Sequence, residues 1–175
     1  MKFVNNINVT KSIRILIILT ISVFFYSNSY CQSKDSIIGK VIGISDGDTF
    51  SLLLEKDNFE IRVRLNDIDC PEKKQPYSQK SKKKLSDLIF GRQCKVYYSK
   101  KDGYGRVLGT VFVNNVNINE EMVRSGFAWH FKKYSDSKIF SDLEIKARKL
   151  KLGLWQDPNP ISPWEWRKLK KNKKI

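Results

Sequence analysis

The chain is poor in histidine, cysteine and methionine, with one, three and two of them in 175 residues. The one histidine, His130, has no acidic residue at a spacing typical of a catalytic pair, and no cysteine–histidine pattern suggests zinc. A histidine-dependent catalytic site and a zinc site are therefore disfavoured, and we expect His130 to be structural or exposed. Cys70 and Cys94 could form a bridge in an oxidising compartment or stay free, and the sequence leaves both possibilities open.

Long apolar runs are also scarce. The run 15–26 (ILIILTISVFFY) follows a basic start made of Lys2, Lys11 and Arg14. Its twelve residues are too few for a comfortable membrane span and are typical of a secretory signal peptide. We expect residues 1–31 to be this signal peptide, with cleavage after Ser29 or after Cys31. The protein is then secreted or periplasmic, without stable membrane association once the leader is removed. An uncleaved membrane anchor and a lipidated Cys31 remain alternatives.

Acidic residues are outnumbered, since 33 lysines and arginines face 18 aspartates and glutamates, for a formal net charge of +15. Residues 1–31 carry three basic and no acidic residues, so the chain without them keeps about +12. What remains suits one domain with a real core, which we place at residues 36–167, followed by a basic tail at 168–175. The charge favours polyanionic partners in a salt-dependent way, and alone it does not distinguish nucleic acid from anionic membrane.

The residue pattern predicts an α+β fold that is mainly β. In 59–66 (FEIRVRLN) Ile61, Val63 and Leu65 share one strand face, while Arg62 and Arg64 share the other. We expect strands at 37–44, 49–55, 59–66, 93–98 and 106–113, and helices at 78–90, from Asn117 or Asn119 to Ser125, and at 137–152. This order indicates a five-stranded OB-fold barrel with about three helices. Pro158, Pro160 and Pro163 predict an extended segment after the last helix, packed through tryptophans.

Three short motifs concentrate carboxylates and arginine beside glycine and proline. They are Asp46-Gly47-Asp48-Thr49, then Asp67-Ile68-Asp69-Cys70-Pro71-Glu72, and finally Tyr104-Gly105-Arg106. Carboxylates on turns are ligands for a hard divalent cation, and arginines can hold a phosphate bidentately. On a basic protein, the combination predicts cleavage of phosphodiesters.

These motifs, in this order, resemble those of the staphylococcal-nuclease-like (thermonuclease) family. The resemblance includes Arg64, five residues before Asp69, and covers about residues 37 to 167. It continues through Val123-Arg124-Ser125-Gly126-Phe127-Ala128, Gly153-Leu154-Trp155, Asp157-Pro158-Asn159-Pro160 and Pro163-Trp164-Glu165-Trp166-Arg167. The last of these segments resembles the ending of secreted bacterial members.

The resemblance implies one bound calcium ion. Its protein ligands would be the carboxylates of Asp48 and Asp69 and the backbone carbonyl of Cys70, with Asp46 supporting the metal or its waters. A backbone ligand is indifferent to its side chain, so cysteine at position 70 is compatible with the site.

The resemblance also implies catalytic roles. Glu72 would be the general base or would orient the attacking water, and Arg64 and Arg106 would clamp the phosphate and stabilise its transition state. Arg62 shares the strand face of Arg64, and we expect it to be structural or a peripheral phosphate contact.

The resemblance implies nucleotide contacts from two tyrosines, Tyr104 and Tyr134, with core packing as the alternative for Tyr104. Lys132 stands where the staphylococcal enzyme has a tyrosine, which is a departure from the family pattern. A group of lysines could follow the nucleic-acid backbone or form a solvated face: Lys73, Lys74, Lys80, Lys82, Lys83 and Lys84.

Together these features predict a secreted, calcium-dependent endonuclease that cleaves DNA and RNA with little sequence preference. The resemblance implies in-line attack by water, 3′-phosphorylated products and a preference for single strands, and we expect a monomer. The alternative is an OB-fold module that binds nucleic acid with weak or no catalysis. Survival of the carboxylates and arginines favours the enzyme.

Overall fold

The core of the protein is a closed β-barrel. The structure, a computed structural model, describes residues 35–172, so the expected signal peptide lies outside it. The barrel strands are β1 (Asp35–Ile44), β2 (Thr49–Leu54), β3 (Glu60–Leu65), β5 (Gln93–Lys101) and β6 (Val107–Val113). They pair in the order β3-β2-β1-β5-β6, and a parallel pairing of β3 with β6 closes the ring. The predicted five-stranded barrel is therefore confirmed.

The barrel closes around side chains selected by strand alternation. Along β6, every second residue from Val107 to Val113 is buried. Phe50 and Leu52 of β2 and Val63 and Leu65 of β3 are fully inaccessible. Burying one such aliphatic or aromatic side chain stabilises the fold by about 1.5–3 kcal/mol. The interior is thus hydrophobic, and the polar groups of β3 are left for the outer face.

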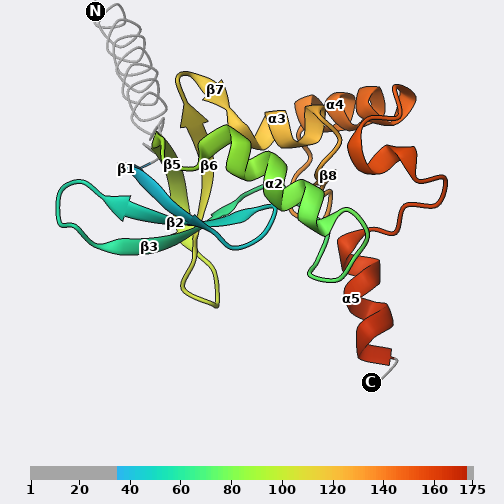
Figure 1. Cartoon of the computed structure of the whole chain (residues 1–175), viewed down its shortest axis with the longest axis horizontal. Coiled ribbons are helices and arrows are strands. Elements are labelled where there is room, and N and C mark those ends of the chain that lie inside the picture. Colours follow the sequence, from blue (N-terminus) through green and yellow to red (C-terminus); the bar gives the residue numbers. More distant parts are fainter. Residues whose placement is uncertain (1–34, 173–175) are drawn as a thin grey trace, which may run out of the picture. The chain divides into compact units, whose positions relative to one another are not determined.

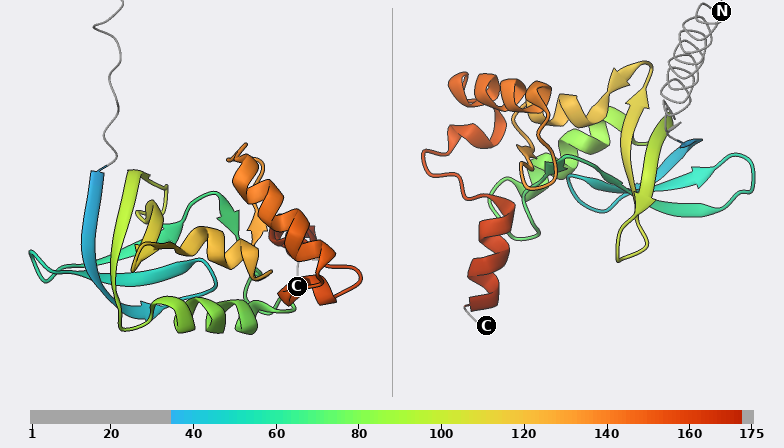
Figure 2. Two further views of the ribbon diagram at one scale, coloured as in Figure 1. Left: turned by 90° about the horizontal axis from the view of Figure 1, so that it is seen from above. Right: turned by 180° about the vertical axis from the view of Figure 1, so that it is seen from behind.

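Within residues 35–172, four α-helices accompany the barrel (Figures 1 and 2). They are α2 (Ser78–Ile89), α3 (Ile118–Arg124), α4 (Lys138–Lys149) and α5 (Pro163–Asn172), with a short 3-10 helix at Gly153–Gln156. None of the helices in residues 35–172 is long and apolar enough to cross a membrane. Asn117 is the residue that caps α3, while Asn119 is buried and donates to the carbonyls of Asn66 and Gly109.

The fourth helix, α5, lies where an extended segment and a basic tail were expected. Pro163 occupies its first position, where a missing N–H costs nothing. Ser162 Oγ accepts from the Glu165 N–H at 3.4 Å, and Glu165 Oε2 accepts from the Ser162 N–H at 3.2 Å, which forms a capping box. The Ser162 hydroxyl also donates to Glu165 Oε2 at 2.5 Å, and the hydrogen bonds that the carboxylate accepts from the Ser162 hydroxyl and N–H lower the pKa of Glu165. The helix therefore has a local start signal, and it continues across the expected boundary at residue 168.

Two small pairings connect the helical part to the barrel. The strand β4 (Ile68–Asp69) pairs with β8 (Trp129–His130), with Asp69 opposite Trp129. The turns after α3 and α4 meet at Gly126 and Gly153, where the Leu154 N–H donates to the Gly126 carbonyl at 2.8 Å. A Cβ on Gly126 would lie 2.3 Å from the Leu152 carbonyl oxygen, so only glycine fits there. These contacts fix α4 and the chain that follows it beside Asp69.

Candidate active site

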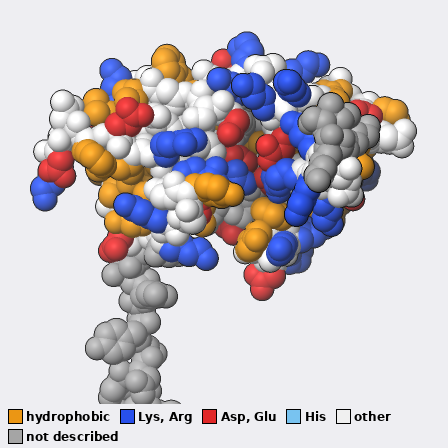
Figure 3. Space-filling model, turned by 90° about the horizontal axis from the view of Figure 1, so that it is seen from below, with side chains coloured by type: hydrophobic (Ala, Val, Ile, Leu, Met, Phe, Trp, Pro, Cys, Tyr) orange, Lys and Arg blue, Asp and Glu red, His pale blue; other side chains and the backbone are white. Residues whose placement is uncertain are grey.

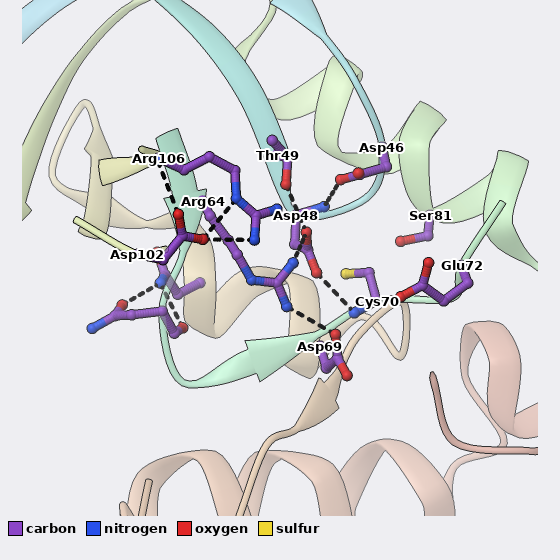
Figure 4. A network of polar contacts seen from close by, with 12 residues as sticks. Asp46, Asp48, Thr49, Arg64, Asp69, Cys70, Glu72, Ser81, Asp102 and Arg106 are labelled. Carbon is purple, nitrogen blue, oxygen red and sulfur yellow. Dashed lines mark hydrogen bonds and ion pairs between the residues drawn. The ribbon is translucent and has the colours of Figure 1, made fainter. Parts of the chain in front are cut away.

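The centre of the candidate site is an arginine held between two buried carboxylates (Figure 4). Asp48 directly precedes β2, Arg64 lies in β3 opposite Thr49, and Asp69 ends β4. Arg64 Nη1 lies 2.5 Å from Asp48 Oδ1, and Arg64 Nη2 lies 2.8 Å from Asp69 Oδ1. The structure therefore brings together three residues that the sequence motifs selected.

Burial controls the protonation of this cluster. Asp48 is 3% exposed and Asp69 is 1% exposed. Burial raises the pKa of Asp48 to about 7, against the lowering effect of Arg64 and with help from the negative charges of Asp46 and Asp69. Burial also opposes the charge of Arg64, but Asp48 and Asp69 together raise its pKa above the ordinary value. A second cation near Asp48 would favour its ionised form.

Backbone geometry holds Asp48 in place. Its Oδ2 accepts from the Cys70 N–H at 3.1 Å, and its Oδ1 accepts from the Thr49 hydroxyl at 3.0 Å. Asp46 Oδ1 in turn accepts from the Asp48 N–H at 3.1 Å, an Asx-type contact that sets the turn. A Cβ on Gly47 would lie 2.0 Å from Ser81 Oγ, so this turn packs directly against α2. Asp46 thus supports the turn that presents Asp48.

Glu72 lies on a loop that is tied down by Gln75. The Glu72 N–H donates to Gln75 Oε1 at 2.9 Å, and the Gln75 N–H donates to the Glu72 carbonyl at 2.8 Å. Gln75 is buried, and its Nε2 donates to the Ile161 carbonyl at 2.7 Å. The position of Glu72 therefore depends on the chain just before α5. Sequence reasoning missed Gln75.

Arg167 of α5 is the second residue that sequence reasoning missed. Its Nη2 lies 2.7 Å from Asp69 Oδ2, and its Nη1 lies 2.5 Å from Glu72 Oε1. Burial opposes its charge, but hydrogen bonds with Asp69 and Glu72 raise its pKa. Asp69 is therefore shared by Arg64 and Arg167. The sequence signal for this residue is the segment Pro163–Arg167, which belongs to the family resemblance but does not by itself indicate a role for Arg167.

Arg106 is held by a different carboxylate. Its Nε and Nη2 lie 2.8 and 2.7 Å from Asp102 Oδ2, and the Arg106 and Tyr104 N–H groups donate to Asp102 Oδ1. Burial raises the pKa of Asp102, but the hydrogen bonds from Arg106 and Tyr104 outweigh this effect and lower it. In the view of Figure 4, Arg106 and Asp102 lie on one side of the Arg64–Asp48 pair and Glu72 lies on the other. Arg106 thus lies on the opposite side of the cluster from Glu72 in this view.

The expected nucleotide contacts are distributed around this centre. Tyr104 is 86% exposed, with the Arg106 guanidinium 5.4 Å from its ring centre, and Tyr134 is 67% exposed. Lys83 and Lys84 are engaged within the protein by Asp87 at 2.7 Å and Glu121 at 3.4 Å. Lys73 and Lys74 are exposed on the Glu72 loop, and Lys82 is half-buried in α2. Lys73 and Lys74 are therefore free of ion pairs on the Glu72 loop, among the pairs found in residues 35–172, whereas Lys83 and Lys84 are each ion-paired.

His130 and the two cysteines lie in the interior. His130 is 1% exposed, its Nδ1 lies 3.1 Å from Ser141 Oγ, and burial lowers its pKa, so it is neutral at pH 7. This agrees with the expected structural role. Cys70 and Cys94 are both buried and free, and burial raises the pKa of each, that of Cys94 to about 12. The open question of a bridge between them is thereby answered.

The donor set can be compared with the requirements of a cation. Within residues 35–172, no group of three or more histidine, cysteine or acidic side chains is arranged to hold a metal ion. The side-chain donors are therefore two carboxylates, those of Asp48 and Asp69, with the backbone at Cys70 directly adjacent. Oxygen donors of this kind suit a hard cation better than zinc, which prefers nitrogen and sulfur ligands.

One face of the molecule has a distinct charge pattern. Figure 3 shows a small group of acidic side chains bordered by lysine and arginine side chains. Such an arrangement favours a polyanion at the surface and a cation in its centre.

Comparison with known proteins identifies the family. The family model described as "Staphylococcal nuclease homologue" matches residues 62–157. An uncharacterized endonuclease of Haemophilus influenzae is 41% identical over 155 residues, which cover 89% of this chain and 86% of that protein. A micrococcal nuclease of Shigella flexneri is 39% identical over 146 residues, which cover 77% of this chain and 82% of that protein. With its closed barrel and its buried carboxylate–arginine cluster, the chain belongs to the staphylococcal nuclease homologue family.

Proposed function

We propose that the protein is an endonuclease that hydrolyses the phosphodiester bonds of nucleic acids. The observation that carries the proposal is the Asp48–Arg64–Asp69 cluster, with Glu72 on the adjoining loop. Family membership and relatives named endonuclease or micrococcal nuclease support nucleic-acid hydrolysis. An arginine held beside carboxylates in a basic protein suits a phosphate group better than a neutral substrate.

Calcium is the proposed cofactor, held by Asp48, Asp69 and the Cys70 carbonyl, with Asp46 fixing the turn. When bound, it would neutralise charge on a substrate phosphate and polarise its P–O bonds. The raised pKa of Asp48 means that the ligand set is fully ionised only above about pH 7. A weak site of this type suits the calcium-rich environment outside the cell.

Catalysis is assigned to side chains on two sides of the cluster. Glu72 takes the proton of the attacking water, and its orientation is fixed by Gln75 and Arg167. Arg64 and Arg106 hold the phosphate oxygens as negative charge develops, because a guanidinium stays protonated and offers two parallel donors. The proton therefore goes to Glu72, while the charge of the phosphate is balanced by arginine.

The remaining parts of the proposal concern substrate, product and location. Exposed Tyr104 and Tyr134 offer rings for base stacking, which supports single-stranded DNA and RNA as substrates with little sequence preference. The P–O5′ bond breaks and the departing 5′ oxygen takes a proton from solvent water, which leaves 3′-phosphorylated products. The enzyme acts as a monomer, and the N-terminal segment directs it out of the cytoplasm. The second candidate, a module that binds nucleic acid without cleaving it, would need the cluster to be incomplete.

The test is digestion of single-stranded DNA and RNA by the purified protein, with calcium or with a calcium chelator. Glu72→Gln and Arg106→Ala are run with Arg62→Ala, an exposed arginine two positions before Arg64, as the matched control. We expect the chelator to stop cleavage and the first two variants to lower kcat by about 10²–10⁴. Cleavage that ignores the chelator, or survives Glu72→Gln, would refute the mechanism.

A further inference from the structure

A groove adjoins the catalytic cluster on the side of α5. Its volume is about 700 Å³, within the range of roughly 300–1,000 Å³ typical of ligand sites. One wall is the segment 129–134, the other is α5, and α4 contributes Glu144 and Arg148. Arg167 lines the groove and also binds Asp69 and Glu72. A ligand bound in the groove would therefore lie against Arg167, the residue that pairs with both carboxylates.

The groove is lined by more basic than acidic side chains. Arg148 is paired with Glu144, and Arg167 is paired with the two catalytic carboxylates. The other basic lining residues are exposed and take part in none of the ion pairs identified among residues 35–172: Lys132, Lys133, Lys168 and Lys171. Two of them belong to each wall, so positive charge faces the groove from both sides, although Lys168 is also close enough to Glu165 to lower its pKa. That charge suits a polyanion.

Aromatic rings accompany these lysines. Phe131 and Trp164 stack with ring centres 5.4 Å apart and planes 2° apart, which joins the two walls. Tyr134 packs its ring edge-on against Phe131 at 4.8 Å while it stays largely exposed. Lysines that follow a phosphate backbone, together with rings on which bases stack, are the usual features of a surface for single-stranded nucleic acid.

The wall formed by α5 is a fixed surface. The Ser162–Glu165 capping box starts the helix, and the Trp164 stack docks it. Lys168 and Lys171 are three positions apart in this helix, so they lie on the same face. Both charges are thereby presented to the groove at a constant spacing. This differs from a mobile tail, whose charges would act only at long range.

We propose that this groove, with Lys168 and Lys171 on its α5 wall, binds the single-stranded substrate beyond the phosphate that is cleaved. The inference rests on the proposed nuclease function, because it assigns to the same active site an additional length of strand. It adds to the catalytic centre a second binding region formed by α4, α5 and segment 129–134. Longer strands should then bind more tightly than short ones, because only a longer strand reaches the lysines of α5.

The experiment compares two double variants of equal charge change. Lys168→Gln/Lys171→Gln alters the groove. Lys40→Gln/Lys56→Gln removes two exposed lysines from β1 and the β2–β3 turn, neither of which lines the groove. Binding of labelled oligothymidylates of four and twelve nucleotides is measured by fluorescence anisotropy in chelator, across a range of salt. Cleavage of the twelve-nucleotide strand and of thymidine 5′-p-nitrophenyl phosphate is measured with calcium.

The groove variant should bind the long strand about tenfold more weakly, with a salt slope smaller by about 1.4 for two lost single-strand phosphate contacts. Its affinity for the short strand and its kcat/KM on the small phosphodiester should stay within about twofold of wild type. An equal loss in the Lys40/Lys56 variant would overturn the inference, and so would an equal loss on the small substrate. If wild type cleaves neither substrate but the length preference still depends on α5, the nuclease function fails and the groove stands.

Discussion

Arg64→Ala should be far more destabilising than its place at the end of an outer strand face suggests. In the folded protein, Arg64 lies 2.5 Å from Asp48 and 2.8 Å from Asp69, and both carboxylates are almost inaccessible to water. Removing the guanidinium leaves buried Asp48 without a cationic partner, while Asp69 keeps only Arg167. Breaking a buried pair by removing one partner costs about 3–5 kcal/mol, since the remaining charge is not resolvated. Arg64 has a side-chain exposure of 18%, so solvent screening reduces this only slightly.

The loss should depend on pH in a defined direction. Burial raises the pKa of Asp48 to about 7 even with Arg64 in place, and Arg64 is the group that opposes this rise. Without Arg64 the folded pKa lies higher still, so the folded state binds a proton more readily than the unfolded state does. Stability of the variant therefore increases as pH falls from this raised folded pKa toward the ordinary value of 3.8. The cost of the substitution is largest near pH 8 and smaller near pH 5.

The assay is urea denaturation of wild type, Arg64→Ala and Arg62→Ala in chelator at pH 8 and pH 5. Arg62 lies on the same strand and the same face but is exposed, so its loss should change the free energy of unfolding by at most about 0.5 kcal/mol. Equal effects of the two substitutions at pH 8 would refute the argument. A penalty for Arg64→Ala that grows toward pH 5 would refute the assigned protonation of Asp48.

Three further outcomes follow from the site. Calcium binding requires ionised Asp48, and burial raises the pKa of this carboxyl to about 7. Calcium affinity measured by calorimetry should therefore be about tenfold weaker at pH 6 than at pH 8. Asp48→Asn should abolish this difference. Gln75→Ala removes the hydrogen bonds that connect Glu72 to Ile161. We expect kcat to fall about 10- to 100-fold, while binding of single strands in chelator is unchanged. The control, Gln79→Ala at an exposed position, should leave kcat unchanged. Gly47→Ala places a Cβ 2.0 Å from Ser81 Oγ and 2.8 Å from Cys70 Cβ, so unfolding by urea should become easier by about 1–3 kcal/mol, and Ser81→Ala in the same chain should recover only part of the loss.

The barrel was predictable because each strand carries its own periodicity. Alternation in β3 and β6 places valine and leucine inside, and a slip of one residue would expose them, so pattern and fold agree. The helix α5 was missed although Ser162-Pro163-Trp164-Glu165 is a local start signal of the capping-box type. The prolines before it and the lysines after it suggested an extended segment with a tail. The composition of the flanking segments therefore led to a wrong prediction, although the sequence contains a helix start signal.

The candidate site was predictable only where its residues form local motifs. Asp46, Asp48, Asp69 and Glu72 are recognisable from their turns, and the barrel brings Asp48 and Asp69 to one arginine. The partners of Arg167 and Gln75 could not be predicted in this way, because both contacts join the Glu72 loop to the end of the chain. Nothing in the spacing of the sequence specifies such a contact. It depends on how the segment after α4 returns past β8.

That return makes the C-terminal helix part of the active site. Asp69 binds Arg64 through Oδ1 and Arg167 through Oδ2, so its charge is balanced from the barrel on one side and from α5 on the other. Arg167 reaches Asp69 and Glu72 only while α5 is docked, and docking depends on the Trp164–Phe131 stack. The electrostatics of the proposed metal ligand and of the proposed base are therefore coupled to a helix that also forms a wall of the groove. Strand binding along α5 and the setting of Asp69 and Glu72 are, on this geometry, two consequences of the same packing.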